Sequence, residues 1–103
     1  MAKEPKIRNI LVLAHQIQRL CEEGKIKTPR EASKWLNMSV VRMDQVMNIL
    51  FLSPNIQNDI LCKQLPAISA ISEYKLRSLL QEINWQTQQE IWEQFLKEAT
   101  LSL

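Results

Sequence analysis

Residues 28–54 have the sequence TPREASKWLNMSVVRMDQVMNILFLSP, in which residue types alone indicate where helices begin. The first start combines an N-cap, a proline at the first helical position and the acidic residue of a capping box: Thr28, Pro29 and Glu31. Ser39 is a second N-cap, placed ahead of another apolar pattern. We therefore predict a short helix from residue 29 to about 36, a tight turn, and a second helix over residues 40–52.

Apolar spacing indicates the interior of this pair of helices. Five residues occupy the positions at which two short helices lock together: Ala32, Leu36, Met38, Met43 and Val46. Ser33 is the small residue where the helices touch. Asn37 stands at the turn position usually held by glycine, because asparagine tolerates a positive φ. Such a unit holds its second helix clear of the surface, where it can enter a major groove roughly 12 Å wide. The pattern predicts a helix-turn-helix at residues 28–52.

The rest of the chain favours an all-α fold. Its 103 residues are 46% hydrophobic, with one glycine and four prolines, too few turn residues for a sheet with many tight hairpins. Apolar periodicity predicts four further helices, over 6–23, from Pro54 to before Pro66, over 73–83 and over 85–98. Their stop and start signals are Gly24, Ser53, Ser72 and Asn84. Residues 66–71 are expected to be a looser segment. We expect one compact domain over residues 1–103, with five to six helices.

The helix predicted over residues 40–52 carries the candidate DNA contacts. Its base-reading candidates are Ser39, Val40, Val41, Arg42, Gln45 and Asn48. Glutamine and asparagine can bond adenine with both amide groups, arginine can reach guanine or a phosphate, and valine can contact a thymine methyl. The hydroxyl of Ser39 can also donate to a phosphate. The phosphate-contact candidates come from the preceding segment: Lys25, Lys27, Arg30 and Lys34.

The charge distribution is uneven along the chain. Residues 1–42 contain nine Lys and Arg against four Glu, a net +5, whereas residues 43–103 contain four Lys and Arg against seven Asp and Glu, a net −3. A basic front half suits a polyanion such as DNA. An ordinary solvated surface with interspersed charges is the alternative that charge alone leaves open.

A resemblance to a known family adds to this interpretation. The residues that carry it are the run Glu31 to Ser39, followed by Met43, Gln45, Val46, Leu50, Leu52, Pro54, Ile56 and Gln57. Over residues 28–80 the chain resembles the central domain of ParB-type partition proteins, which implies sequence-specific binding of duplex DNA by the helix that starts at Ser39. The chain departs from that pattern at Asn37, where glycine is usual, and at Pro54, which lies one position late. It also departs at Val40 and Val41, where polar or basic residues are common. Nothing before residue 28 resembles that family's nucleotide-binding domain, so no CTP switch is expected.

A second likeness concerns the segment LSPNIQ at residues 52–57. It is similar to small helix-turn-helix proteins encoded beside site-specific recombinases in mobile elements. Together the two resemblances imply a regulator or accessory factor of a mobile genetic element, acting in partition, recombination or transcription. The expected partner is double-stranded DNA, and a recombinase or other protein partner is a further candidate.

Other residues give no sign of catalysis. His15 is the only histidine and has no metal-binding partner at helical spacing, and one glycine cannot build a phosphate loop. Cys21 and Cys62 lie among apolar residues at helical spacing and are expected to be core thiols. We expect no enzyme activity, no cofactor and no metal. The absence of a signal peptide or a membrane segment of about 20 apolar residues favours a cytoplasmic protein with no membrane contact.

The aromatic residues leave two points open. Trp35, Trp85 and Trp92 are expected to anchor a core or an interface rather than to stack on bases. The stripe on the last helix, formed by Trp92, Phe95, Leu96 and Ala99, can pack on the body or form a homodimer seam, and we favour the body. The rival function is a protein-interaction adaptor, in which Val40, Val41 and Ile49 together with the acidic C-terminal half hold a protein partner.

Overall fold

The computed structural model describes residues 5–101, and this part of the chain is all-helical, as predicted. Its elements are α1 (Lys6–Glu22), α2 (Pro29–Trp35), α3 (Val40–Asn48), the 3-10 helix η1 (Ile49–Phe51), α4 (Pro54–Cys62), α5 (Pro66–Ser69), α6 (Glu73–Leu79) and α7 (Trp85–Leu101). The seven α-helices in this part slightly exceed the predicted five to six.

Side-chain caps begin most of the helices where the sequence predicts them. Three serine hydroxyls each accept a hydrogen bond from the backbone N–H three residues later. The bonds run from Arg42 N to Ser39 (3.0 Å), from Ile56 N to Ser53 (3.3 Å) and from Lys75 N to Ser72 (3.3 Å). The Asn84 side chain accepts from Gln86 N at 2.8 Å. Gly24 (φ 75°) and Asn37 (φ 53°) adopt the left-handed conformation expected at the ends of α1 and α2.

Several boundaries differ from the prediction. The Thr28 side chain makes no cap hydrogen bond, and Glu31 Oε2 instead accepts from Lys27 N at 2.7 Å, one residue before the expected donor. The segment over residues 66–71 is not loose throughout, because Pro66 begins the one-turn helix α5, which is too short to show a periodic pattern. Helix α6 ends at Leu79 rather than residue 83, and α7 continues to Leu101 rather than residue 98.

The end of the predicted 40–52 helix is also different. It leaves α geometry after Asn48 and continues as η1. Side chains three residues apart eclipse one another in a 3-10 helix, so Ile49 and Leu52 both enter the core. Phe51 is left on the outside, with 69% of its surface exposed.

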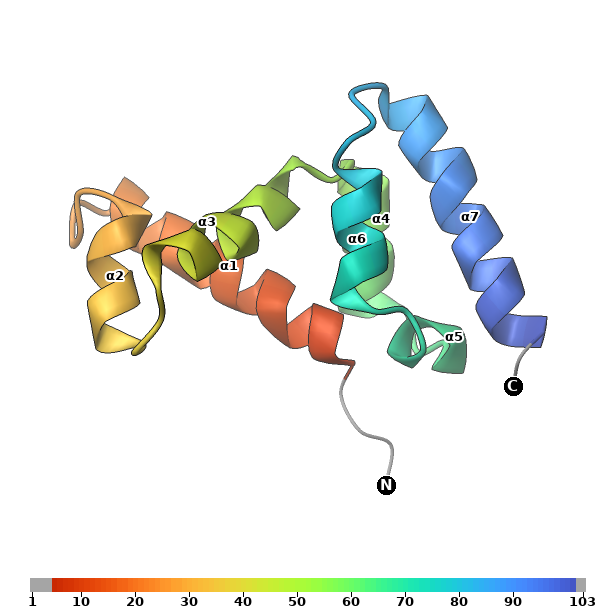
Figure 1. Cartoon of the computed structure of the whole chain (residues 1–103), viewed down its shortest axis with the longest axis horizontal. Helices are drawn as coiled ribbons and strands as arrows, with labels where there is room; N and C mark the ends of the chain where they lie inside the picture. Colours follow the sequence, from red (N-terminus) through yellow and green to blue (C-terminus); the bar gives the residue numbers. More distant parts are fainter. Residues whose placement is uncertain (1–4, 102–103) are drawn as a thin grey trace.

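Two apolar clusters hold the helices together, and α1 contributes to both. The smaller cluster joins α1 to α2 and α3 through Ile17, Ile26, Ala32 and Met43. The larger cluster surrounds the first half of α1 with residues from η1 and α4 to α7, including Ile7, Leu11, Ile49, Ile60, Ile68, Leu76 and Trp92. In Figure 1, α2 and α3 therefore lie at one end of the molecule and α7 lies at the other.

Helix α7 packs on the body of the molecule, as the sequence favoured. Trp92 is fully buried, and its Nε1 donates a hydrogen bond of 2.9 Å to Asp59 Oδ2 on α4. Ala99 is buried and Phe95 and Leu96 are partly buried against the larger cluster. The stripe on α7 is consequently covered within one chain and is not available as a dimer seam.

The expectation for the two cysteines is half right. Cys21 is partly buried against the smaller cluster, but Cys62 is exposed at the end of α4. The inward face of α4 carries Ile56 and Ile60, and two residues beyond Ile60 an α-helix has turned by about 200°. Cys62 therefore faces away from the core.

Candidate nucleic-acid interface

The turn between α2 and α3 is built from short backbone and side-chain bonds. Ser33 is 3% exposed, and its hydroxyl donates to Arg30 O at 2.6 Å, while its carbonyl accepts from Met38 N at 2.9 Å. Together with Asn37 at positive φ, these bonds fold the chain back within three residues of the end of α2. Helices α2 and α3 pack against each other and both pack against α1. This part of the chain thus has the predicted order of helix, turn and helix.

The predicted interior of this unit is correct except at one position. Ala32, Met43 and Val46 are buried and Met38 is partly buried, but 43% of Leu36 is exposed. Leu36 is the C-cap residue of α2, and the interior beside it is already formed by Met38 and Met43. The prediction that Leu36 locks the helices together is therefore wrong.

The outward face of α3 carries three of the base-reading candidates. Val41, Gln45 and Asn48 have the spacing i, i+4 and i+7, which places them on one face of a helix. Val41 is 68% exposed and Asn48 is exposed, whereas Gln45 is half-buried. Ser39 and Val40 are exposed at the start of the helix. The face therefore presents an aliphatic side chain at its beginning and two amides further along.

Arg42 is held by a helix distant in sequence. Its guanidinium forms a two-bonded ion pair with Glu73 on α6, with Nη2 2.8 Å from Oε1 and Nη1 bonded to Oε2. Nη1 also donates to Gln45 Oε1 at 3.3 Å. The hydrogen bonds from Arg42 hold the pKa of the Glu73 carboxyl below its usual value, because they favour its charged form. In this arrangement Arg42 orients Gln45 and does not extend from the surface.

The phosphate-contact candidates fall into two groups. Arg30 Nη2 on α2 lies 3.2 Å from Asp44 Oδ2 on α3, and Lys25 Nζ lies 3.2 Å from Glu23 Oε2. Both are ion pairs between exposed side chains, which contribute little to stability and exchange readily with other ions. Lys27 and Lys34 are exposed and form no ion pair with residues 5–101. They are the most available cations of the four.

An exposed apolar surface flanks the turn, and we call it the turn patch. It consists of Trp35 (68% exposed), Leu36, Val40 and Val41 (68% exposed). The sequence predicts that Trp35 anchors a core or an interface, and its exposure excludes the core. All four lie within residues 35–41, and exposed apolar residues that gather at one place are typical of interaction sites.

A second exposed apolar surface was missed by sequence reasoning. Phe51, Ile83 and Trp85 line a pocket of about 440 Å³ at the far end of α3, beside Asn48. Ile83 was predicted to be the last residue of a helix over residues 73–83. Because α6 instead ends at Leu79, Ile83 lies in the connection to α7, where its side chain is exposed. The one available signal was Phe51, an aromatic residue that follows Asn48 on the helix with the reading face.

The histidine of the described range, His15, belongs to a hydrogen-bond network between helices. His15 Nε2 shares a 2.8 Å hydrogen bond with Gln57 Oε1, and Gln57 Nε2 donates to the carbonyls of Leu50 and Leu52. This network ties α1 to η1 and α4. No three His, Cys, Asp or Glu side chains in the described range gather as metal ligands would. Nor does that range contain a helix of the length and apolarity needed to span a membrane.

No model of a known protein family, no curated protein and no solved structure matches this chain. A functional proposal therefore depends on the geometry of α2 and α3 and on the residues that carry the family resemblance.

Proposed function

We propose that this chain binds double-stranded DNA sequence-specifically, with α3 as the reading helix. The observation that carries the proposal is the line formed by Val41, Gln45 and Asn48 on the outward face of α3. The opposite face, with Met43 and Val46, is locked into the interior. A helix held in this way can enter a major groove without distortion of its own fold.

Each residue of the line has a matching base edge. Gln45 and Asn48 would each accept from N6 and donate to N7 of adenine, and Val41 would contact a thymine methyl. Arg42 donates to Gln45 Oε1, which leaves the second lone pair of that oxygen and the amide N–H groups for the base. The reading geometry of Gln45 thus depends on the ion pair between Arg42 and Glu73.

Phosphate contacts would come from the start of α2 and the segment before it. Lys27 and Lys34 have no competing carboxylate within residues 5–101, so they can bind phosphates directly. Arg30 would exchange Asp44 for a phosphate, and Asp44 would then be free to accept a hydrogen bond from cytosine. The Ser39 hydroxyl lies at the N-terminus of α3, where anions are favoured.

The biological setting of the proposal follows from the two resemblances. We place the chain among regulators or accessory factors of mobile genetic elements, acting in the cytoplasm without a catalytic step or a cofactor. Partition, recombination and transcription all use proteins that mark a site on duplex DNA, and the proposed mechanism is the same for each.

The deciding experiment is enrichment of random duplex DNA by the purified chain, at about 50 mM and about 200 mM salt. A recurring motif at both concentrations, bound more weakly at the higher one, is the expected result, because phosphate contacts weaken with salt. No motif at either concentration would exclude sequence-specific reading by α3.

The turn patch favours a second candidate, a protein-interaction adaptor. Trp35 and Val41 expose more apolar surface than contact with phosphates requires. In this alternative the patch holds an apolar surface of another protein, and Ile49 has no part in it because it is fully buried. An apolar contact of this kind would persist or strengthen with salt, which separates the two functions in a single titration.

A further inference from the structure

Helix α2 has a pocket on its outward side, and we call it the α2 pocket. Its volume is about 480 Å³, and it is lined by Thr28, Arg30, Glu31, Lys34 and Trp35. At roughly 100° per residue, the four lining residues of the helix itself lie on the half of α2 opposite the buried Ala32 and Ser33. Because α2 packs against α1 and α3 at one end of the molecule (Figure 1), this outward half is exposed within residues 5–101.

The charges of the α2 pocket favour an anionic ligand. Lys34 forms no ion pair within residues 5–101. Arg30 is paired with Asp44, but both side chains are exposed, so this pair exchanges readily with other ions. Glu31 is the one carboxylate of the lining, and its Oε2 already accepts from Lys27 N at 2.7 Å. Arg30 and Lys34 lie roughly 6 Å apart along the axis of α2, so two anionic groups of one strand can each meet a cation.

Trp35 adds an aromatic surface beside these cations, because 68% of it is exposed. A base stacked on an aromatic ring contributes to binding whatever its identity, since every base has a π-face. Inside a duplex each base is covered by its neighbours, so only an unpaired and unstacked nucleotide can present this face to a protein. The α2 pocket therefore combines the two features of a site for single-stranded nucleic acid, a stacking platform and cations for the backbone.

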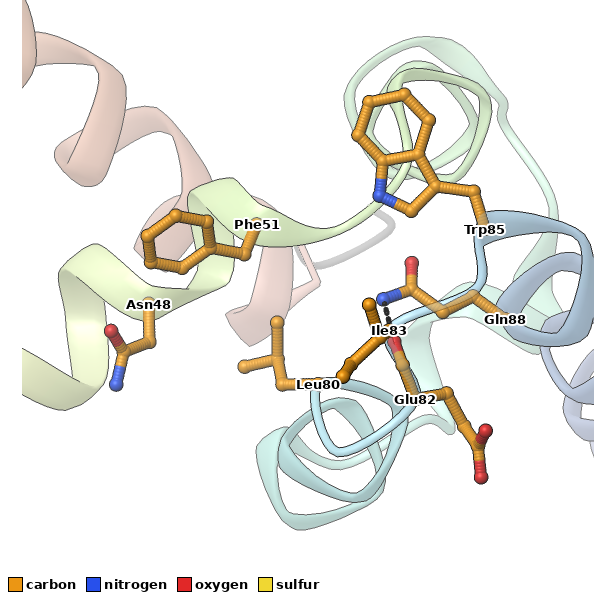
Figure 2. Close-up of a pocket in the computed structure, with 7 residues that line it drawn as sticks. All are labelled: Asn48, Phe51, Leu80, Glu82, Ile83, Trp85 and Gln88. Carbon is orange, nitrogen blue, oxygen red and sulfur yellow. Dashed lines mark hydrogen bonds between the residues drawn. The ribbon is translucent and has the colours of Figure 1, made fainter.

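A second exposed tryptophan provides the comparison. Trp85 is 55% exposed and lines two pockets. Figure 2 shows one of them, surrounded by Trp85, Phe51 and Ile83, with the Glu82 carboxylate pointing away. Among the described residues that line the two pockets, none is a lysine or an arginine. Exposure of an aromatic ring is thus not sufficient to indicate a nucleotide, and its two cations distinguish the α2 pocket.

We infer that the α2 pocket binds an unpaired nucleotide of a DNA strand, with the base stacked on Trp35 and phosphates on Lys34 and Arg30. This assignment differs from the sequence expectation, in which Trp35 anchors a core or an interface. An apolar protein surface on the ring would desolvate both cations without pairing them, which costs free energy. A nucleic-acid strand covers the ring and neutralises the cations together. The Thr28 hydroxyl, which makes no cap hydrogen bond, can donate to a phosphate.

The α2 pocket lies beside the helix that we propose to read duplex DNA, and this step alone rests on the proposed function. Arg30 lines the pocket and also reaches Asp44 on α3, the residue before Gln45. A strand that leaves a duplex held by α3 would therefore find the α2 pocket nearby. We expect the chain to bind a duplex that ends in an unpaired strand more tightly than a blunt duplex.

The test uses labelled octathymidylate, a single strand that forms no duplex and needs no reading by α3. Fluorescence anisotropy at about 50 mM salt is expected to give the wild type a Kd in the range of about 10⁻⁶ to 10⁻⁴ M. Trp35→Leu keeps an apolar side chain but removes the π-face, and should weaken binding at least about fivefold. Trp35→Phe retains a ring and should bind within about twofold of the wild type. Trp85→Leu makes the same change in a pocket without cations and should bind as the wild type does.

Salt dependence tests the cations. Lys34→Gln should reduce the slope of log K against log salt by about 0.7 for the single strand, because one phosphate contact is lost. Lys97→Gln, on the exposed side of α7, has the same change in charge and should preserve the wild-type slope. Circular dichroism and a matching Tm establish that each variant is folded.

Three results would overturn the inference. A wild type that does not bind octathymidylate at about 0.1 mM protein would exclude the site. Equal binding by wild type and Trp35→Leu would exclude stacking and leave Trp35 to a protein partner. Tighter binding of octauridylate than of octathymidylate would overturn the assignment to DNA.

A duplex arm separates this inference from the proposed function. An unpaired thymidine tail on a duplex with the enriched motif should strengthen binding by the wild type, and this gain should disappear in Trp35→Leu. Binding of octathymidylate without any duplex motif would remove the proposed function and leave the α2 pocket standing. Binding of a duplex motif without affinity for octathymidylate would do the reverse.

Discussion

Arg42 on α3 and Glu73 on α6 are 31 residues apart and form a two-bonded ion pair, with Arg42 Nη2 2.8 Å from Glu73 Oε1. The Glu73 side chain is 18% exposed and that of Arg42 is 36% exposed, so water screens the pair only partly. The same guanidinium donates to Gln45. One interaction thus joins α6 to the outward face of α3, and under the proposed function stability and DNA recognition would depend on the same carboxylate.

Glu73→Gln is expected to lower the free energy of unfolding by about 1 kcal/mol at pH 7, a value reduced for the partial exposure of both partners. Because the pKa of Glu73 is lower in the folded chain than in the unfolded chain, the pair stabilises the fold above the unfolded pKa, about 4.3. This contribution is lost as the pH falls through the folded pKa. Urea denaturation at pH 7 and pH 3 should therefore show a smaller difference in stability between the two proteins at pH 3 than at pH 7. Glu90→Gln, on the exposed side of α7, is the control and should behave as the wild type at both pH values.

Gln45→Ala is expected to relax base preference at one or two positions of the bound site. Loss of a two-bonded contact with adenine costs about 1–3 kcal/mol of discrimination, while binding to unrelated duplexes is unchanged. Enrichment of random duplexes with the variant measures the effect position by position. Gln94→Ala removes the same side chain from the exposed surface of α7 and should leave the motif intact. A wild-type motif from Gln45→Ala would show that α3 does not read bases as proposed.

Lys34→Ala is expected to weaken binding to all duplexes alike, because a phosphate contact contains no sequence information. The slope of log K against log salt should fall in magnitude by about one. Affinity measured at four or more salt concentrations gives this slope directly. Lys97→Ala, on α7 at the other end of the molecule, has the same change in charge and should preserve the wild-type slope.

Asn37→Ala is expected to destabilise the fold by about 1 kcal/mol, because alanine lacks the short polar side chain that lets asparagine adopt a φ of 53° more readily than other L-residues. Asn37→Gly should be at least as stable as the wild type, since glycine accepts this conformation without strain. Thermal and urea denaturation of the two variants would measure both effects. Asn9→Ala, on the exposed face of α1, provides the matched control and should not be destabilised. Equal stability of Asn37→Ala and the wild type would contradict the left-handed turn.

Trp92→Phe is expected to lower the free energy of unfolding by about 1–3 kcal/mol, since it removes the donor to Asp59 Oδ2 and part of the buried ring. Trp35→Phe makes the same substitution at a side chain that is 68% exposed and should change stability by less than about 0.5 kcal/mol. Denaturation at low protein concentration compares the two. A similar loss for both variants would mean that α7 is not anchored through Trp92.

Features that depend on a few neighbouring residues could be predicted from the sequence. Ser39, Ser53 and Ser72 cap helices because each cap involves a hydroxyl and a backbone N–H three residues later. Asn37 turns the chain because asparagine tolerates the left-handed backbone conformation that this turn requires. The all-helical class and the helix, turn and helix order of residues 29–48 follow from such local rules and from apolar periodicity.

Features that depend on which face of a helix meets another helix could not be predicted in this way. Periodicity places Leu36 and Cys62 inside, yet both are exposed, because neither faces the helices that pack against its own. Ile49 is buried rather than available to a partner, since the change from α to 3-10 geometry rotates it inward. The helix end at residue 79 leaves Ile83 in a connection, and from there the fold brings it beside Phe51.

Some features of the candidate site could likewise be predicted from local sequence, and others depend on the packing of helices. The amino-acid sequence was sufficient to predict the helix that we propose to read DNA and to include Val41, Gln45 and Asn48 among its outward residues, because a helical repeat is a local property. Only the tertiary structure determined that Arg42 pairs with Glu73, that Arg30 pairs with Asp44, and that Phe51, Ile83 and Trp85 line one pocket beyond the end of α3. Those pairings join side chains on different helices, and their geometry exists only after the two apolar clusters have brought the helices together.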